Sequence, residues 1–295
     1  MTGLATRPEV ERDADPEHLL ELLSQHLMDS FKQLEKVKNC AVLFSGGVDS
    51  SLAALLTKKI CDDTLLITAW GEGSHDANVA VRAAESMNLP LVEIELHSTL
   101  IWEILPELMK AIDSRKRMDV EIALPFFLVA KEAKSRGYEL LVSGQGPDEL
   151  FGGYARYEKM MVEYGPEEVE QALWADFSIT DQANLIRDTQ SVKVHGIDVF
   201  FPYVYTEFAK IALTIPASMN IDPSKQPSRK LLFRELAMRL GVPSEVALTP
   251  KRATQYSSGS ARLLEQAIRD NVISIRNLAK RELHPAIQEF LDSFD

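Results

Sequence analysis

The chain has 295 residues, of which 45% are hydrophobic, so it is long enough to bury one large core or two smaller ones. Its formal net charge of −12 at pH 7 repels phosphate backbones, which disfavours nucleic acid as a partner. Its two cysteines, Cys40 and Cys61, match no metal-binding spacing, and this favours a reducing, cytoplasmic setting. The N-terminus lacks an apolar signal segment, and no apolar run approaches the roughly 18 residues of a membrane span.

The first half of the chain alternates short apolar runs with amphipathic segments. Residues 1–16 are polar and aperiodic, so we expect a loose tail there, followed by a helix from Glu17 whose apolar residues recur at helical spacing. Strands are predicted over 40–45, 64–70, 90–96 and 139–143, and helices over 49–59, 76–87 and 121–136. This alternation predicts an α/β fold with a parallel sheet covered on both faces, in which ligands bind beyond the carboxyl ends of the strands.

The second half of the chain has a different pattern. After about Tyr164, strand signals thin out, and helical patterns dominate, as over 230–241 and 261–283. No internal repeat or low-complexity linker separates the halves. We therefore expect a core over 17–165 and a mostly helical part over 166–295 that can share the same core.

The string AVLFSGGVDSS, residues 41–51, predicts a phosphate-binding loop. Gly46 and Gly47 follow a predicted strand directly, and glycine lets backbone N–H groups come close to an anion. Serine hydroxyls add donors at the start of the next helix, from Ser45, Ser50 and Ser51. Asp49 fits beside a phosphate only with a hard cation such as Mg²⁺, which binds both kinds of oxygen. A simple turn before a capped helix is the alternative, but the complete string after a strand favours the phosphate loop.

A second glycine-rich string, LLVSGQGPDELFGGYARY, covers residues 140–157. Gly144 and Gly146 again follow a predicted strand, and Asp148 comes directly after them. Two glycine loops at strand ends can face each other across a nucleotide, and we expect Asp148 then to share a Mg²⁺ ion with Asp49. An acidic surface turn is the alternative, which the density of glycines after a buried strand disfavours.

Both strings resemble motifs of known families. The first resembles the SGGxDS loop of the ATP pyrophosphatases, or PP-loop enzymes, and no Walker motif occurs. This resemblance implies the PP-loop fold and cleavage of ATP between its α and β phosphates, which yields AMP and pyrophosphate. The second resembles the SGEGADELFGGY motif in the synthetase domain of asparagine synthetases, whose relatives include the β-lactam synthetases. The resemblance extends from about Leu19 to about Gly259.

Further motifs carry the resemblance into the second half. LIRDTQSVKVHGIDVFFP, residues 185–202, is similar to the family's LLRDDRMSMAHGLEVRVPFLD pattern, and KLLFRE, residues 230–235, to its KxxLRE helix. TPKRATQYSSG, residues 249–259, places Lys251 on the family's catalytic lysine. A lysine suits this chemistry because a carboxylate that attacks the α-phosphate builds negative charge, and Lys230 is a second candidate. His195 also matches the pattern, but we assign it no catalytic role.

The resemblance implies an adenosine pocket as well, lined by Leu43, Trp70, Ser143 and Gly144. Leu43 and Trp70 suit plain core positions equally well, because both lie near the ends of predicted strands.

The chain departs from the family's pattern at its substrate positions. Gln145 stands where asparagine synthetases carry a glutamate, and an amide can position a substrate but cannot take up its proton. This change leaves adenylation intact and suggests a different nucleophile. Phe200, Phe201 and Tyr205 replace the Arg, Val and Asp of the family's RVPFLD segment. The acceptor therefore need not be aspartate.

A third departure concerns the source of the amine. Asparagine synthetases begin with a glutaminase domain and a cysteine after the initiator methionine, whereas Thr2 follows Met1 here. We therefore expect the protein to use free ammonia, a separate glutaminase subunit or a different amine. The helical half is a candidate interface to that subunit or to a second copy of the chain.

The sequence thus favours an ATP-dependent, AMP-forming amide ligase with ATP and Mg²⁺ as cofactors. An acceptor carboxylate would be adenylated, and an amine would then displace AMP. Two alternatives stay open. A PP-loop enzyme that adenylates a tRNA base is disfavoured by the acidic charge. A non-catalytic ATP-binding module is favoured by Gln145 and opposed by the retained Asp49, Asp148 and Lys251.

Overall fold

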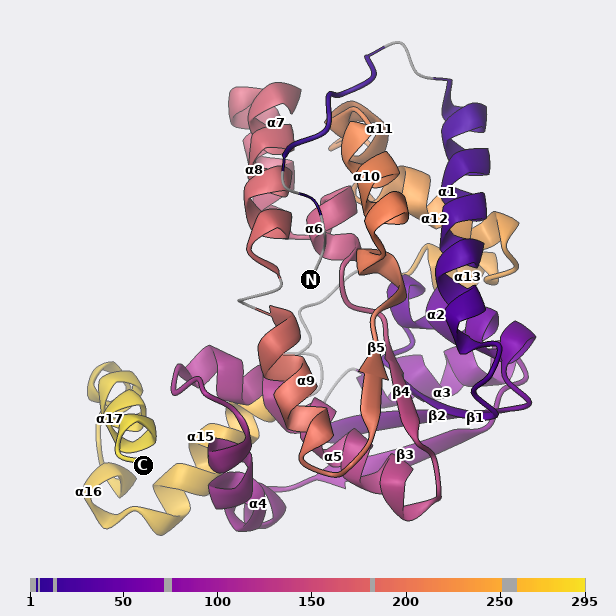
Figure 1. The fold of residues 1–295 in the computed structure, drawn as a ribbon. Helices are drawn as coiled ribbons and strands as arrows, with labels where there is room; N and C mark the ends of the chain where they lie inside the picture. The colour runs from indigo at the N-terminus through magenta and orange to yellow at the C-terminus, as the bar shows by residue number, and fades with distance from the viewer. Residues whose placement is uncertain are drawn as a thin grey trace.

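The computed structural model describes residues 4, 6–12, 15–71, 76–180, 184–250 and 259–294. A five-stranded sheet with the order β3-β2-β1-β4-β5 lies at its centre (Figure 1). All neighbouring strands run parallel, and their bounds are β1 Asn39–Leu43, β2 Asp63–Gly71, β3 Leu91–Leu96, β4 Leu140–Ser143 and β5 Asp198–Phe200. The parallel α/β sheet predicted from the sequence is therefore confirmed.

Helices cover both faces of the sheet. One apolar cluster contains side chains of α1 Pro16–Phe31, α2 Val48–Ile60, α3 Asp76–Ser86, α10 Thr206–Thr214 and α12 Leu231–Arg239. The other contains side chains of α4 Ser98–Ala111, α5 Arg117–Ser135, α9 Ile186–Lys193, α15 Ser260–Asn271 and α17 Lys280–Asp292. Val42 packs in the first cluster and Ala41 in the second, because successive side chains of a strand point to opposite faces.

Shorter elements complete the architecture. They are η1 Lys32–Leu34, α6 Pro147–Phe151, α7 Ala155–Tyr164, α8 Pro166–Ser178, η3 Pro202–Val204, α11 Ala217–Asn220, α13 Ser244–Ala247 and α16 Ile273–Arg276. Within the described ranges, no helix combines the length and apolarity needed to cross a bilayer.

Three details differ from the expected elements. Helix α4 was not among the predicted helices. β5 was not predicted, because its three residues are too few to show a period and become a strand only by pairing with β4. The helical pattern over 261–283 is divided among three helices, α15, α16 and α17, which lie together at one end of the molecule (Figure 1). Helical spacing continues across the breaks, since Ile275 and Leu283 still face the core. Periodicity alone therefore does not reveal the breaks.

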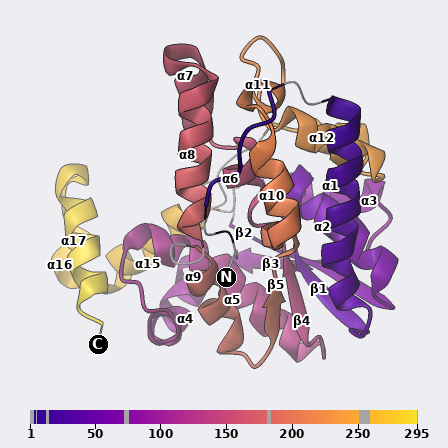
Figure 2. The ribbon, with the colours of Figure 1, turned by 45° about the horizontal axis from the view of Figure 1, so that its top comes forward.

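The two halves of the chain contribute to the same cores. The first cluster combines Leu23 of α1 and Leu52 of α2 with Phe208 and Phe233 from the second half. The described part of the N-terminal segment crosses α8 and α10 (Figure 2). There, Arg12 Nη1 and Nη2 donate to the two carboxylate oxygens of Glu170 at 2.8 and 2.7 Å.

Helix α1 is fixed to the sheet edge by an aromatic contact. The ring of Phe31, which is fully buried, meets the ring of Phe200 of β5 edge to face, with centroids 5.7 Å apart and planes at 85°. Such a pair stabilises a fold by about 0.5–1.5 kcal/mol beyond its burial. The first helix of the chain thus supports the last strand of the sheet.

We expect Phe31→Ala to lower the free energy of unfolding by about 3–5 kcal/mol, because it leaves a cavity between α1 and β5. Urea denaturation followed by circular dichroism measures this change. Val162, which is 73% exposed, provides the control, and Val162→Ala is expected to change stability by less than about 0.5 kcal/mol. Equal effects of both substitutions would show that Phe31 does not anchor α1.

Candidate functional site

The candidate site lies where the strand order reverses. β1 pairs with β2 on one side and with β4 on the other, so the loops after β1 and β4 leave the same edge of the sheet in neighbouring positions. The two loops are in close contact, because a Cβ atom at Gly144 would come within 2.9 Å of the amide nitrogen of Ser50. Only glycine permits this approach, and the two predicted loops therefore form one site.

The loop after β1 is wound tightly onto the start of α2. Gly46 has φ +74°, and a Cβ there would lie 2.7 Å from the carbonyl oxygen of Val79. The backbone N–H of Ser45 donates to Ser50 Oγ at 3.2 Å, and this hydroxyl donates to the carbonyl oxygen of Gly47 at 3.2 Å. Gly47 caps the helix without a side chain, so the first N–H groups of α2 carry the partial positive charge that suits a phosphate.

A buried lysine joins the two loops. Lys230 Nζ lies 2.8 and 2.7 Å from the two carboxylate oxygens of Asp49 and 2.7 Å from Asp148 Oδ1. The lysine side chain is 0% exposed, and each aspartate side chain is 14% exposed. Because buried charges are stable only when they are paired, each of the three groups holds the others in place.

The position of Lys230 depends on its backbone. It precedes α12 with φ +57°, in the left-handed region that costs a non-glycine residue about 1 kcal/mol. In this conformation the side chain of Lys230 reaches Asp49 and Asp148. Such a backbone conformation persists only where the surrounding structure fixes it, as the contacts with Asp49 and Asp148 do here.

Gly153 makes room for the ion-pair cluster. A Cβ atom there would lie 1.7 Å from Asp148 Oδ1 and 2.2 Å from Lys230 Cε. Any side chain at this position would displace the carboxylate or the lysine. The second glycine of the FGGY string is therefore required to leave space for Asp148 and Lys230, and not to form a turn.

Tyr203 of η3 holds the start of α2 in place, directly after the first loop. Its hydroxyl donates to the carbonyl oxygen of Asp49 at 2.7 Å. Burial raises the pKa of this hydroxyl well above its usual value, so Tyr203 remains a donor at neutral pH. Sequence patterns did not identify Tyr203, because its role depends on β5 bringing η3 beneath α2.

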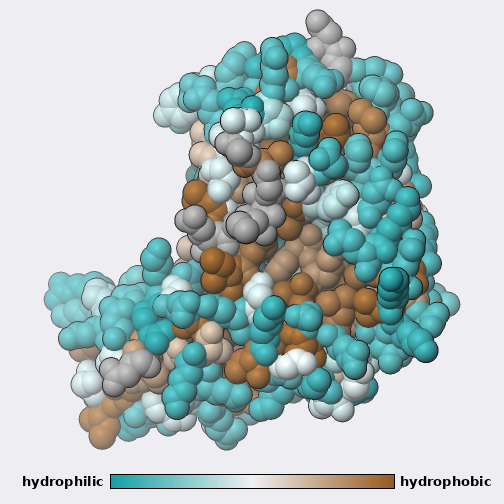
Figure 3. Space-filling model, in the orientation of Figure 1, coloured by the Kyte–Doolittle hydropathy of each residue, from teal (hydrophilic) through white to brown (hydrophobic). Residues whose placement is uncertain are grey.

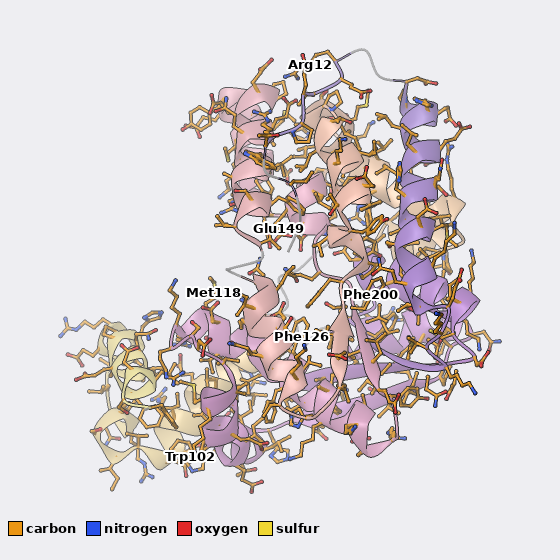
Figure 4. The ribbon with its side chains drawn as sticks, in the orientation of Figure 1. Arg12, Trp102, Met118, Phe126, Glu149 and Phe200 are labelled. Atoms are coloured by element: carbon orange, nitrogen blue, oxygen red, sulfur yellow. The ribbon has the colours of Figure 1, made fainter. Side chains whose placement is uncertain are left out.

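A cavity beside the cluster collects most of the predicted site residues. Its lining includes Leu43, Ser45, Asp49, Ser50, Ser143, Gly144, Gln145 and Asp148. The remaining described walls are Phe44, Thr68, Ala69, Ile122, Pro125 and Phe126. Figure 4 labels Phe126 near the middle of the molecule. A cavity with apolar walls and polar groups at one end suits a nucleotide.

The walls from α5 were missed by sequence reading. Ile122, Pro125 and Phe126 lie within one amphipathic helix, where they look like ordinary core residues. No spacing rule distinguishes a helix residue that lines a cavity from one that fills the core. Only the packing of α5 against β2 and β1 decides it.

Other predicted residues lie elsewhere. Gly46 lines a neighbouring cavity together with Arg82 and Glu245. Trp70 is absent from the described walls of the cavity beside the cluster, and its ring N–H donates to Glu93 Oε2 at 2.9 Å. Gly47 is the N-cap of α2 and Ser51 lies in the first turn of that helix, and neither lines the cavity. Lys251 lies outside the described residues.

Glu149 is an additional buried carboxyl group next to the cluster. Its Oε1 accepts hydrogen bonds from the hydroxyl of Tyr154 at 2.6 Å and from Asn184 Nδ2 at 3.3 Å. Its Oε2 is buried without a hydrogen-bond partner among the described residues. Burial, and then the charge of Asp148, raise the pKa of Glu149 to about 7.

His195 is a packing residue. Its ring meets the ring of Phe127 edge to face with centroids 4.3 Å apart, and burial lowers its pKa.

Gly153→Ala is expected to lower the free energy of unfolding by about 1–3 kcal/mol, because the added methyl overlaps Asp148 and Lys230. It should also weaken ATP binding, which isothermal titration calorimetry measures. Gly137, which has φ +85° and no atom near its Cβ position, is the control. Gly137→Ala is expected to cost only the backbone penalty of about 1 kcal/mol and to leave ATP affinity unchanged. If Gly153→Ala and Gly137→Ala bind ATP with equal affinity, a side chain at position 153 does not disturb the site.

The raised pKa of Glu149 leads us to expect that the stability of the protein depends on pH. Its pKa rises from about 4.5 in the unfolded chain to about 7 in the folded protein, so only the folded protein holds this proton between those values. The free energy of unfolding should therefore fall as pH rises through this window.

Glu149→Gln is expected to lack that decrease and to be more stable than the parent above pH 7, on the order of 1–3 kcal/mol. Urea denaturation between pH 5 and 8, without nucleotide or divalent metal, measures it. Glu103→Gln, at an exposed position of α4, is the control and should follow the parent. A parallel shift of all three profiles would refute the assignment.

Comparison with known proteins agrees with this geometry. Residues 22–166 and 162–292 match the family model of asparagine synthase. The chain is 30% identical over 305 residues to a Methanocaldococcus jannaschii protein provisionally named glutamine-hydrolysing asparagine synthetase 1, covering 94% of this chain and 54% of that protein. It is 28% identical over 207 residues to the glutamine-hydrolysing asparagine synthetase of Asparagus officinalis, covering 66% of this chain and 34% of that enzyme.

Among solved structures, the NMN synthetase of Francisella tularensis aligns with a TM-score of 0.41 and 14% identity, over 96% of this chain and 88% of that one. The chain spans about half the length of the archaeal relative and about a third of the plant enzyme. The family model includes both glycine loops and the helix that follows Lys230. From the match to the family model and the 30% identity to the archaeal relative, we conclude that the chain belongs to the asparagine synthase family.

Proposed function

We propose that the protein is an ATP-dependent ligase that forms an amide and releases AMP and pyrophosphate. The observation that carries this proposal is the convergence of Asp49, Asp148 and Lys230 where the two glycine loops meet. Family membership supports it, because the named relatives are synthetases. The lining of the cavity beside the cluster supports it as well, because it combines apolar walls with a few polar groups, as nucleotide sites do.

In the first step, a carboxylate oxygen of the acceptor forms a bond to the α-phosphorus of ATP. The bond from that phosphorus to the bridging oxygen breaks, and pyrophosphate leaves with the electron pair. The N-terminus of α2 and the hydroxyls of Ser45 and Ser50 hold phosphate oxygens. The ammonium of Lys230 opposes the negative charge that develops, and Lys251 is proposed as a second cation from its place in the family motif.

The donor set suits Mg²⁺. The carboxylates of Asp49 and Asp148 already converge on one cationic atom, Lys230 Nζ, and Mg²⁺ prefers one or two carboxylates combined with phosphate oxygens. When bound, the ion would neutralise phosphate charge. Asp49 and Asp148 would hold it, one from each loop.

In the second step, the amine nitrogen attacks the acyl carbon, and AMP leaves with its phosphate oxygen. The amine gives up one proton, which passes to water, because Gln145 lines the cavity but has no basic lone pair at neutral pH. Gln145 can still orient the amine or the acyl-adenylate by hydrogen bonds. A nucleophile that is neutral before it attacks, such as ammonia, needs no stronger base.

The test is acceptor-dependent release of pyrophosphate and AMP from ATP with Mg²⁺. Carboxylic acids are offered with ammonia, beginning with L-aspartate. We expect Lys230→Met and Lys251→Ala to lower turnover by at least about 100-fold, because each removes a cation near the reacting phosphate. Lys110→Ala, at an exposed position of α4, is the control and should retain parental turnover.

Circular dichroism and ATP binding establish whether each variant is folded. Lys230→Met is the more sensitive in this respect, since it leaves two partly buried carboxylates without their cation. A folded Lys230→Met protein with full turnover would contradict the role of Lys230. If the protein binds ATP but none of the acids in the panel supports pyrophosphate release, the ligase proposal is rejected.

A further inference from the structure

A second cavity of about 720 Å³ lies along β5, the edge strand of the sheet. Its apolar wall is made of Ile186, Val199, Phe200, Phe201, Val204 and Tyr205. Figure 3 shows an apolar, hollowed area in the middle of this face, where Figure 4 labels Phe200. Cavities of roughly 300–1,000 Å³ are typical of small-molecule sites.

One loop separates this cavity from the candidate nucleotide cavity. Gln145 lines the nucleotide side, and the next residue, Gly146, touches the other side. A Cβ atom at Gly146 would lie 3.3 Å from Val204 Cγ1, and Val204 lines the second cavity. The cavity extends along β5 from Asp198, the first residue of the strand, to Val204 beyond its end, so its Val204 end lies beside the loop that carries Gln145 and Asp148.

The wall exposes apolar surface that a partner molecule would cover. Ile186 is 49% exposed, and Val199, Phe200, Phe201 and Tyr205 are only half-buried. Covering such surface stabilises a complex by roughly 25 cal/mol per Å². The wall thus favours a ligand with an apolar group.

The charges of the cavity disfavour a dicarboxylate. Lys193 is the only cationic side chain among the described lining residues, and its Nζ lies 3.5 Å from Asp198 Oδ1, also in the lining. This pair leaves no uncompensated cation for a second carboxylate. The other polar lining residues, Gln33, Thr189, Gln190 and Thr206, are neutral, so a side-chain carboxylate such as that of aspartate would leave water without meeting an unpaired cation there, which is costly.

We propose that this cavity seats the apolar side chain of the acid that the site adenylates. The substrate is then a carboxylic acid with an aliphatic or aromatic side chain, and its carboxylate lies toward the Gln145–Gly146 loop. This inference rests on the proposed function for the reaction, but the cavity's preference for apolar acids is measurable without turnover.

Binding is measured first. Isothermal titration calorimetry with the full chain, Mg²⁺ and a non-cleavable α,β-methylene analogue of ATP gives Kd for hexanoate, 3-phenylpropionate and L-aspartate. We expect the two apolar acids to bind at least tenfold more tightly than aspartate. Pyrophosphate release from ATP is then measured with the same three acids.

Ile186→Lys places a charge in the wall at an exposed position, so the fold should tolerate it. It is expected to weaken binding of hexanoate and 3-phenylpropionate by roughly tenfold or more, since it removes apolar contact from the site. ATP affinity should be unchanged. The matched control is Ile273→Lys, because Ile273 is 84% exposed on α16 and does not line the cavity. It should bind both acids like the parent.

The outcomes separate this inference from the proposed function. Binding of aspartate as tight as that of the apolar acids, or no binding of the apolar acids, overturns the inference, even when aspartate supports pyrophosphate release. Equal binding of the apolar acids by the parent and Ile186→Lys also overturns it. Binding that depends on Ile186 without pyrophosphate release supports the cavity's role and rejects adenylation.

Discussion

The ammonium of Lys230 lies between the carboxylates of Asp49 and Asp148, which come from two loops almost a hundred residues apart. Because all three groups are largely buried, none is stable without the others. The remaining features of the site accommodate this contact. Gly153 leaves space for it, Tyr203 holds the carbonyl group of Asp49, and the left-handed backbone of Lys230 directs the lysine inward.

The topology of the sheet makes this contact available. β1 and β4 are neighbours because the chain crosses over after β3 and returns to the other side of β1, which places two strand ends and their loops together. β5 then extends the sheet on the same side and brings η3 under the first loop. The same strand carries Phe200, which packs on α1 and also lines the second cavity. Phe200 of the edge strand thus both stabilises the fold and lines the proposed substrate cavity.

Much of this was predictable, for local reasons. Gly46, Gly47 and Asp49 directly follow an apolar strand, and that order of residues is sufficient to indicate a phosphate loop. Four of the five strands have a run of apolar residues long enough to recognise, whereas the three residues of β5 do not. The place of Trp70 in an adenosine pocket stays a prediction, because its position in the motif does not fix what its ring contacts, and in the structure its N–H donates to Glu93.

The sequence by itself determined the parallel α/β fold, the two glycine loops and the carboxylates that they carry, because glycine conformation and strand periodicity act over a few residues. Tertiary structure decided which cation meets those carboxylates, which α5 side chains wall the cavity, and that Phe200 and Val204 line a second cavity beside Gln145. These contacts join residues far apart in the chain. Their geometry depends on how helices pack on the sheet, which no local pattern records.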